Sequence, residues 1–244
     1  YMFIDECQDF NSDEINDFCQ HGTYCWFFGD SFQSIMGFPN HTVQSVEDTA
    51  KQIGVHPQDL CINWRLTIEN AKVGEHIRPH SRLSFACIKH GPKPRLVKSN
   101  AQLDKIIEYI SNGNLTDVGI LVYYNGQVER IRDYFQSKGI PVQWKTKEDM
   151  EIDFKSTSPK IITWHSAKGL QFNDVFIPCC GLGEYKQLVT WAYEPMEQEA
   201  ALYVATTRPL ENLYLLYSNN LAPLLPNSNS PVYSGNAGTN SGPF

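Results

Sequence analysis

The chain has 244 residues, 41% of them hydrophobic and 19% charged, which is typical of a globular protein and long enough for one large domain or two ordinary ones. Its formal net charge of −7 argues against a chain that coats nucleic acid without specificity, although a local basic groove remains compatible with it. No apolar run approaches the roughly 20 residues that a membrane-spanning helix needs, so no membrane partner is expected.

The first predicted elements alternate between strand and helix. Residues 1–4 and 24–28 are apolar and are expected to form buried strands, with a polar helix between them that begins near Ser12. The first strand runs directly into Asp5 and Glu6. At the carboxyl end of a strand in such a sheet, one carboxylate can hold Mg²⁺ and its neighbour can activate a water molecule.

A nucleotide site of this kind also needs a phosphate-binding loop. The pattern G-x-x-x-x-G-K-[ST] occurs nowhere in the chain, because the sequence contains no Gly-Lys dipeptide. The sequence therefore predicts half of a site. The other half is expected in a missing amino-terminal segment or on a partner chain, and a first residue that is not Met also hints at a fragment.

The segment after the second strand carries further polar groups. Residues 29–35 (GDSFQSI) follow that strand directly, at the sheet edge where α/β proteins bind ligands. Gln33 in this segment could place an amide where it senses a phosphate or the attacking water. Taken alone, the segment is an ordinary turn, and its position one strand–helix–strand unit after Asp5 favours the functional interpretation.

A second set of elements begins after residue 60. Apolar runs predict short strands, and helical periodicity predicts two helices that alternate with them, as in parallel α/β units. The expected strands are 60–62, 120–124, 160–164, 175–179 and 213–217, and the expected helices are 127–135 and 197–207. The stretch from Asn219 onward has no charged residue and is expected to be a flexible linker or tail.

Polar groups also stand at junctions within this second set. Asn63-Trp64-Arg65 follows the strand 60–62, and an isolated Arg of this kind is usually a surface salt-bridge residue. Residues 162–170 (ITWHSAKGL) run from a strand toward a helix with donors that suit phosphate oxygens, and Gly169 permits a close backbone approach. Arg208 closes the helix 197–207, where it either complements the helix dipole or reaches a triphosphate held by another domain.

In this order the segments resemble the superfamily 1 DNA helicases of the UvrD/Rep/PcrA type, over residues 1 to about 218. Each motif alone is weak to moderate support, and together they stand in the family's order on the expected elements. The matching segments are 3–9 (motif II), 29–35 (motif III), 63–65 (motif IV), 163–172 (motif V) and 202–208 (motif VI).

The resemblance implies an α/β fold of the RecA-like P-loop NTPase helicase type. Residues 1–58 would be the C-terminal part of a first RecA-like domain, 59–218 a complete second RecA-like domain, and 219–244 a flexible tail. The implied activity is ATP-dependent DNA unwinding or translocation, with 3′ to 5′ direction on single-stranded DNA. ATP and Mg²⁺ are the implied cofactors, and the chain alone, without the Walker A segment, is expected to be inactive.

The resemblance also assigns roles around the nucleotide. Asp5 would hold Mg²⁺ and Glu6 would be the general base. Gln8 and Gln33 would couple the γ-phosphate to DNA. Arg65 and Arg208 would act as arginine fingers, a type of group that is worth about 10³–10⁵ in rate.

Further positions complete the implied site. Gly169 would approach the γ-phosphate, and Gln171 stands where the family has a Glu that binds the ribose. Phe38 would stack on a DNA base, worth about 1–3 kcal/mol, and Thr163 and His165 would contact the backbone of the strand.

Several positions depart from the family pattern. Gln171 removes a charged acceptor for the sugar, Pro39 stands where the family often has Arg, and Glu199 and Ala200 replace basic residues. Gln171, Pro39 and the acidic net charge are compatible with an alternative function, a degenerate helicase-like module that binds DNA or a partner without turnover.

Three other features have a possible functional interpretation that is less favoured than a structural one. Residues 153–155 (DFK) are similar to a nuclease motif but lack upstream carboxylates, and the basic run 89–95 is more often a solvated loop than a DNA contact. The seven cysteines include no C-x-x-C pair, so buried thiols in a reducing cytoplasm are expected ahead of metal or disulfide roles.

Overall fold

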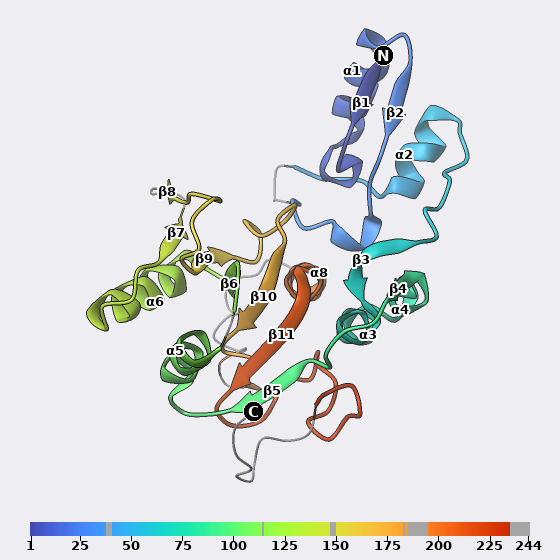
Figure 1. Ribbon diagram of the computed structural model, residues 1–244. Coiled ribbons are helices and arrows are strands. Elements are labelled where there is room, and N and C mark those ends of the chain that lie inside the picture. The colour runs from blue at the N-terminus through green and yellow to red at the C-terminus, as the bar shows by residue number, and fades with distance from the viewer. Residues whose placement is uncertain (38–40, 114, 147–149, 183, 185–194, 235–244) are drawn as a thin grey trace.

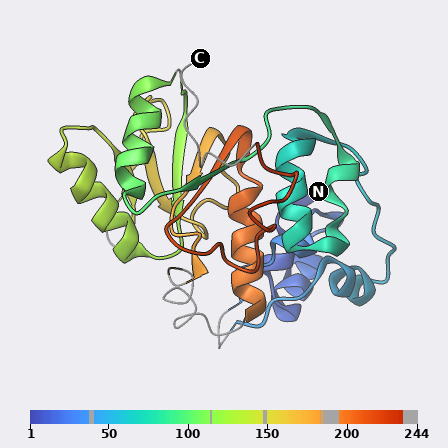
Figure 2. The same ribbon diagram turned by 90° about the horizontal axis from the view of Figure 1, so that it is seen from below.

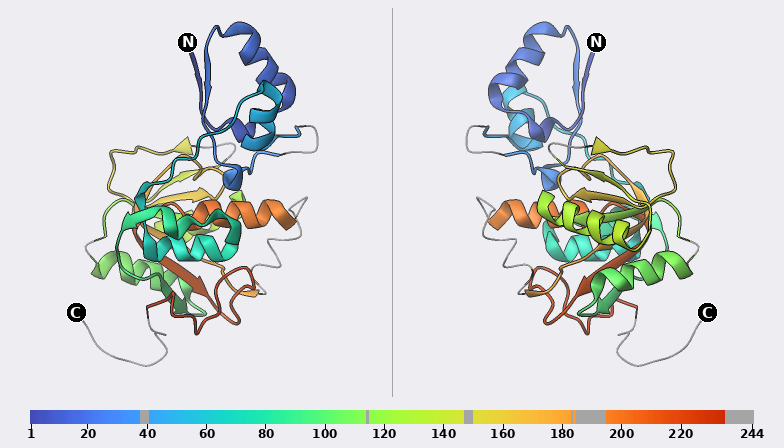
Figure 3. Two further views of the ribbon diagram at one scale, coloured as in Figure 1. Left: turned by 90° about the vertical axis from the view of Figure 1, so that its right-hand side faces the viewer. Right: turned by 90° about the vertical axis from the view of Figure 1, so that its left-hand side faces the viewer.

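The amino-terminal part forms a small α/β unit. The computed structural model describes residues 1–37, 41–113, 115–146, 150–182, 184 and 195–234. In it, β1 (Met2–Ile4) and β2 (Cys25–Phe27) pair in parallel, accompanied by α1 (Ser12–His21) and α2 (Val46–Ile53). Asn11 starts α1 with a capping box, because its side chain accepts from the backbone N–H of Glu14 and its own N–H donates to the Glu14 side chain. This small sheet stands apart from the large sheet in Figures 1 and 3.

One face of this small sheet is exposed, which corrects the expectation of two buried strands. Successive side chains alternate between faces, and Met2 and Cys25 turn toward α1, where Cys25 Sγ donates to Phe18 O at 3.3 Å. Their neighbours turn the other way: Phe3 is 69% exposed and its register partner Trp26 is 56% exposed. The apolar residues of β1 and β2 were therefore predicted correctly as strands and wrongly as buried on both faces.

A second short sheet links the two parts of the chain. β3 (Asn63–Thr67) pairs in parallel with β4 (Cys87–Lys89), and α3 (Ile68–Ile77) and α4 (Leu83–Ala86) lie between them in sequence. The strand expected over 60–62 is thus displaced toward the carboxyl end. Leu60 and Ile62 are exposed, whereas Leu66 is fully buried, so the buried residues fix the strand position.

The large sheet confirms the α/β class expected from the sequence. Its strand order is β5-β11-β10-β6-β9-β7-β8, and all neighbours are parallel except the antiparallel edge pair of β7 and β8. The strands are β5 (Arg95–Lys98), β6 (Val118–Val122), β7 (Gln143–Lys145), β8 (Met150–Glu151), β9 (Lys160–Thr163), β10 (Phe172–Ile177) and β11 (Pro209–Tyr217). Every residue of β6 (VGILV) is buried, as a central strand with two covered faces requires.

Helices cover both faces of the large sheet. The helices α5 (Gln102–Asn112) and α6 (Asn125–Ser137) lie on one face, and α3 and α8 (Pro195–Thr206) lie on the other, as Figure 2 shows. Each face has its own cluster of buried apolar side chains. The helices predicted over 127–135 and 197–207 are confirmed with shifted ends.

The stretch after β11 packs against the rest of the chain as far as residue 234. Ala222, Leu225 and Tyr233 are buried in the core cluster that includes α8, and the backbone N–H of Ser234 donates to Pro94 O at 3.0 Å. The flexible tail expected over 219–244 is therefore wrong for 219–234. Apolar side chains set between turn-forming Pro and Asn residues give this stretch enough buried surface to stay in place. Residues 235–244 lie outside the described part of the chain.

The structure also shows the state of the cysteines and the length of the helices. All seven cysteines are free; Cys7, Cys87 and Cys180 are buried as expected, whereas Cys19 and Cys61 are exposed. Among the described residues, none of the helices combines the length and apolar character needed to cross a membrane.

Candidate functional site

The first strand ends in a tight turn that carries two carboxylates. Glu6 follows β1 with φ 53°, a left-handed backbone conformation that non-glycine residues seldom adopt, and its N–H donates to Asp5 Oδ1 at 2.9 Å. Such strained residues cluster at functional sites. Gln8, two residues on, is fully buried and its amide Nε2 donates to Glu6 Oε2. The turn thus presents Asp5 to solvent and holds Glu6 against an amide.

The segment after β2 meets this turn. Asp30 donates its backbone N–H to Gln8 Oε1 at 3.0 Å, and its carboxylate receives the N–H of Phe32 at 2.9 Å and the Nε2 of Gln33 at 2.7 Å. Gly29 precedes it, and a Cβ there would lie 2.5 Å from Gln8 Oε1. Glycine is therefore required for the two turns to approach each other this closely.

Arg208 reaches this cluster from the large sheet. Its side chain is 2% exposed, and Nε donates to Val204 O at 2.9 Å while Nη2 donates to Gln33 Oε1 at 2.9 Å. Burial, reinforced by the nearby charge of Arg65, lowers the pKa of Arg208 to about 10. The guanidinium is still charged at neutral pH. Glu6, Gln8, Asp30, Gln33 and Arg208 therefore form one continuous set of hydrogen bonds, which we call the polar relay.

Lys168 makes a second connection between the two sheets. Its Nζ lies 2.6 Å from both carboxylate oxygens of Asp9 and 3.3 Å from Glu6 Oε2. Burial raises the pKa of Asp9 even though Lys168 acts in the opposite direction. The loop that follows β9 is thereby tied to the turn that follows β1.

Arg65 lies beside Arg208 on β3. Its buried Nε has no hydrogen-bond partner within the described part of the chain. A buried and unsatisfied guanidinium nitrogen is costly, because the group gives up its water without compensation. A buried Nε does not fit the simple alternative of a surface salt-bridge residue, and it leaves one donor of Arg65 without an acceptor.

The remaining predicted residues lie around or beyond this cluster. Thr163 ends β9, where its hydroxyl donates to Ser166 Oγ at 3.1 Å, and the ring of His165 lies 5.8 Å from that of Tyr123. Gly169 has φ 77° and an open surrounding, and Gln171 is exposed. Phe38 and Pro39 lie outside the described residues.

The structure therefore brings together part of the predicted site. Glu6 is hydrogen-bonded to Gln8 and Gln33 to Arg208, Asp30 connects the two pairs, and Asp5 and Arg65 stand beside them. Three participants were not predicted from the sequence: Asp9, Asp30 and Lys168. Each lies inside or next to a motif segment already singled out, and a charged residue in such a segment was the available signal.

The carboxylates at this place fit Mg²⁺ in part. Asp5 is exposed and presents carboxylate oxygen, and Mg²⁺ is commonly held by one or two carboxylates together with substrate phosphates. No cluster of three or more His, Cys, Asp or Glu suited to a metal occurs among the described residues. The site therefore suits a cation that arrives with a phosphate ligand rather than a cage built by protein alone.

Two segments with minor alternative interpretations have structural explanations. Lys89 donates to Leu210 O at 3.1 Å and Lys93 to Pro231 O at 2.9 Å, so the basic run 89–95 is used in packing. Asp153 forms a local turn by accepting from Lys155 N at 2.8 Å.

A cavity of about 180 Å³ lies away from the relay, at the carboxyl ends of β10 and β11. Its acidic group, Glu184, accepts hydrogen bonds from Gln102, Ser218 and the backbone of Gly181. Because these partners already satisfy the carboxylate, the relay remains the stronger candidate site.

Comparisons with known proteins bear on the same segments. Residues 143–220 match the family model of the UvrD-like helicase C-terminal domain. A protein of Acanthamoeba polyphaga mimivirus, named as a putative ATP-dependent DNA helicase, is 27% identical over 252 residues, covering 90% of this chain and 35% of that protein. The chain thus spans about a third of the length of this relative.

One solved domain has a fold similar to that of this chain. The C-terminal domain of a possible DNA helicase from Lactobacillus plantarum WCFS1 has a TM-score of 0.52 and 17% identity, covering 70% of this chain and 98% of that one. The PRRSV helicase has a TM-score of 0.45 and 16% identity, covering 88% of this chain and 34% of that one. The first likeness concerns the fold alone. Residues 143–220 are thus similar to the UvrD-like helicase C-terminal domain, and the similarity to the viral relative extends over most of the chain.

Proposed function

We propose that the chain is the C-terminal part of an ATP-dependent DNA helicase or translocase that works on single-stranded DNA in the cytoplasm, with 3′ to 5′ direction. The observation that carries the proposal is the polar relay. It connects Glu6, a candidate water-activating carboxylate on the small sheet, to Arg208, a candidate arginine finger on the large sheet. Residues 1–58 would belong to the first RecA-like domain and 59–218 to a complete second one.

The residues divide the chemistry between the two sheets. Bound ATP with Mg²⁺ would supply the phosphoryl group and the cation, and Asp5 would be the carboxylate ligand. Glu6 would accept the proton of the attacking water through the oxygen that Gln8 and Lys168 leave open, since both contact Oε2. Gln8 and Gln33 would report the state of the γ-phosphate.

Positive charge for the transferring group would come from the large-sheet side. Arg208 is already charged and oriented by three carbonyl or amide oxygens. The unsatisfied Nε of Arg65 would gain a partner when an anion arrives. Gly169 would let the backbone approach the phosphates, and Gln171 would contact the sugar.

DNA would contact the residues at the carboxyl end of β9 and after β2. Thr163 and His165 would touch the phosphate backbone, and Phe38 would stack on a base. The net charge of −7 requires such contacts to be local.

DNA binding gives the first test. We expect the chain to bind fluorescently labelled single-stranded oligonucleotides, measured by anisotropy, and Thr163→Ala and His165→Ala to weaken binding several-fold. Lys93→Gln serves as the control, because Lys93 is used in packing with Pro231. Equal binding by all three variants and the unchanged chain would contradict the DNA contacts.

Turnover gives the second test. We expect no ATP hydrolysis by this chain alone, because none of its segments has the glycine-lysine loop that cradles phosphates. ATPase activity of this polypeptide that single-stranded DNA stimulates and that Glu6→Gln abolishes would overturn this expectation. In a longer polypeptide that supplies the loop, the same substitution is expected to abolish hydrolysis.

A module that binds DNA or protein without turnover is the second candidate. Its favouring observation is Gln171, which is exposed and replaces the charged acceptor of the family. The intact polar relay favours the enzyme, because simple binding does not require a carboxylate and a buried arginine to be connected.

A further inference from the structure

The polar relay has a direction. Arg208 Nη2 donates to Gln33 Oε1 at 2.9 Å, and Gln33 Nε2 donates to Asp30 Oδ2 at 2.7 Å. The backbone N–H of Asp30 donates to Gln8 Oε1 at 3.0 Å, and Gln8 Nε2 donates to Glu6 Oε2. Every hydrogen bond therefore points from the cation toward the anion, and each amide accepts on one side and donates on the other.

The orientation of Gln33 depends on both of its neighbours. A guanidinium only donates, so Gln33 must turn its oxygen toward Arg208 and its NH₂ group the other way. The half-buried NH₂ group then faces Asp30, whose carboxylate, when ionised, has no donor and can only accept. Asp30 thus fixes which end of the Gln33 amide faces Arg208.

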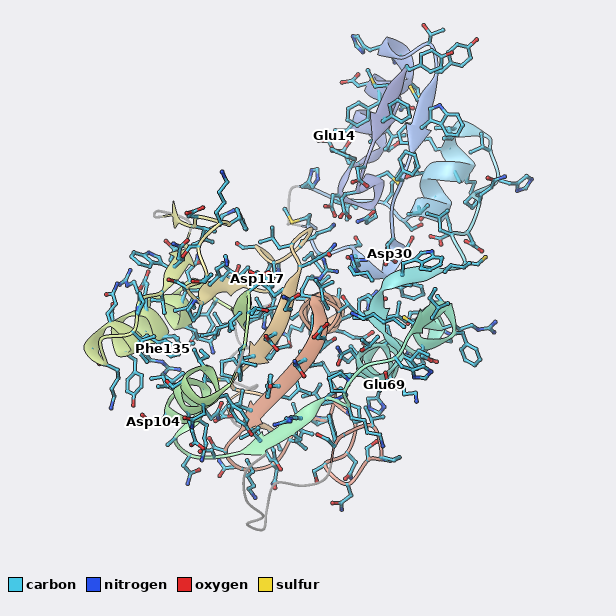
Figure 4. The ribbon with its side chains drawn as sticks, in the orientation of Figure 1. Glu14, Asp30, Glu69, Asp104, Asp117 and Phe135 are labelled. Carbon is cyan, nitrogen blue, oxygen red and sulfur yellow. The ribbon has the colours of Figure 1, made fainter. Side chains whose placement is uncertain are left out.

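Asp30 is itself held in place by its turn. Its other oxygen, Oδ1, caps the backbone N–H of Phe32 at 2.9 Å, which locks the carboxylate at the start of the short helix Ser31–Gln33. Figure 4 labels Asp30 at the junction between the small sheet and the remainder of the chain. The negative charge of Asp30 also raises the pKa of Arg208, and so opposes the lowering that burial causes.

We propose that Asp30 is a positioning residue for the reaction, and that it acts by setting the polarity of the Gln33 amide and hence the placement of Arg208. This role rests on the proposed function, because Arg208 is a candidate arginine finger only in that context. Asp30 would touch neither nucleotide nor DNA. It would link the position of Arg208 to that of Gln8 and Glu6 through its carboxylate and its backbone N–H.

An exchange of partners tests the idea directly. In Asp30→Asn, the new NH₂ group would face the NH₂ group of Gln33, so the amide would have to rotate and present donors to Arg208. In Gln33→Glu, two carboxylates would face each other. In the double variant Asp30→Asn/Gln33→Glu, the amide introduced at position 30 would donate to the carboxylate introduced at position 33, whose other oxygen would accept from Arg208.

The measurement is solvent exchange of the Arg208 guanidinium protons by NMR, in the chain labelled with ¹⁵N-arginine and without nucleotide or DNA. The signals are assigned with Arg208→Lys. We expect these protons to exchange at least about tenfold faster in Asp30→Asn, since a charge-assisted hydrogen bond is worth about 1.5 kcal/mol or more and about 1.4 kcal/mol is tenfold. The double variant is expected to return toward the original rate.

Two further variants keep the test decisive. Asp153→Asn is the matched control, because Asp153 also caps a backbone N–H two residues on, at 2.8 Å, but does not belong to the relay. Gln33→Leu leaves the Asp30 turn in place and removes the amide, so it should also speed exchange of the Arg208 protons. It provides the measurement if Asp30→Asn does not fold.

Unchanged exchange in Asp30→Asn or Gln33→Leu, or no recovery in the double variant, would reject the positioning role. These results do not depend on DNA binding or ATP hydrolysis. Failure of the positioning role is therefore distinguishable from failure of the proposed function.

Discussion

Lys168 Nζ lies 2.6 Å from each carboxylate oxygen of Asp9, and this contact joins the loop after β9 to the turn after β1. The side chains of Lys168 and Asp9 are 9% and 19% exposed, so water screens the pair little. Because Lys168 also lies 3.3 Å from Glu6 Oε2, the same cation touches the candidate general base. The contact therefore bears on both the stability and the chemistry of the junction between the sheets.

Lys168→Gln should destabilise the chain. The substitution leaves the half-buried Asp9 carboxylate without its cation, and an unpaired charge of this kind is expected to cost about 1–3 kcal/mol in the free energy of unfolding. Equilibrium urea denaturation measures the change. Lys138→Gln is the control, because Lys138 forms an exposed pair with Asp104 at 3.8 Å and should change stability by less than about 0.5 kcal/mol. Equal effects of the two variants would show that the Asp9 contact adds nothing.

Gly29→Ala should disturb the contact between the two turns. The new Cβ would lie 2.5 Å from Gln8 Oε1 and 2.8 Å from Cys7 Sγ, so these groups would have to move. Overpacking of this kind is expected to cost about 1–3 kcal/mol, measured by urea denaturation. Gly37→Ala is the matched control, because the nearest atom to its Cβ would be Val43 Cγ2 at 3.8 Å. A neutral Gly29→Ala would mean that the two turns are less closely packed than described.

Asp174 should give the chain a distinctive pH dependence. Burial raises the pKa of Asp174, although Asn212 and the backbone of Thr116 donate to its carboxylate. The folded chain then binds more protons than the unfolded chain, in a window from the ordinary carboxyl pKa of about 3.9 up to the raised value. The contribution of Asp174 to the free energy of unfolding is therefore full below this window and is lost as pH rises through it.

Asp174→Asn should flatten that dependence, whatever its effect on absolute stability. Urea denaturation at a series of pH values across the window measures the slope. Asp133→Asn, at an exposed residue paired with Arg132, is expected to leave the slope unchanged. An identical slope in Asp174→Asn and the original chain would refute the prediction.

Tyr233→Ala should release the stretch that follows β11. Tyr233 is buried and its hydroxyl donates to Pro226 O at 3.2 Å. Truncating a buried aromatic side chain is expected to cost about 3 kcal/mol and to expose the stretch to proteases. Limited proteolysis with mass spectrometry locates the cuts. Asn219→Ala, at an exposed residue, should leave the pattern intact.

Much of the fold could be predicted because the chain's apolar runs are unambiguous. β6 is short, apolar and buried throughout, and β9 is buried throughout with two isoleucines at its centre; such runs indicate parallel strands without knowledge of their partners. The motif order likewise placed Gln33 and Arg208 in one site, and the structure brings their side chains to 2.9 Å. The catalytic roles assigned to them stay predictions.

The rest could not be predicted because it depends on contacts between distant residues. Lys168 stands in a motif segment, but nothing in the sequence shows that its partner is Asp9, 159 residues away. Phe3 and Trp26 alternate with covered neighbours, and only the packing of α1 on one side decides which of them face water. The sequence likewise does not reveal that Leu225 and Tyr233 join the core, because the surrounding Asn, Ser and Pro residues are typical of disorder.

The position of β11 has a consequence for how the chain acquires its fold. β11 lies between β5 and β10, so β5 has no partner in the large sheet until residues 209–217 are available. β6 must likewise pair with both β9 and β10, which follow it in sequence. During synthesis the large sheet would therefore be completed only after β11 has left the ribosome. Sheets closed by such distant pairings fold slowly, and partly made chains would expose strand edges for that interval.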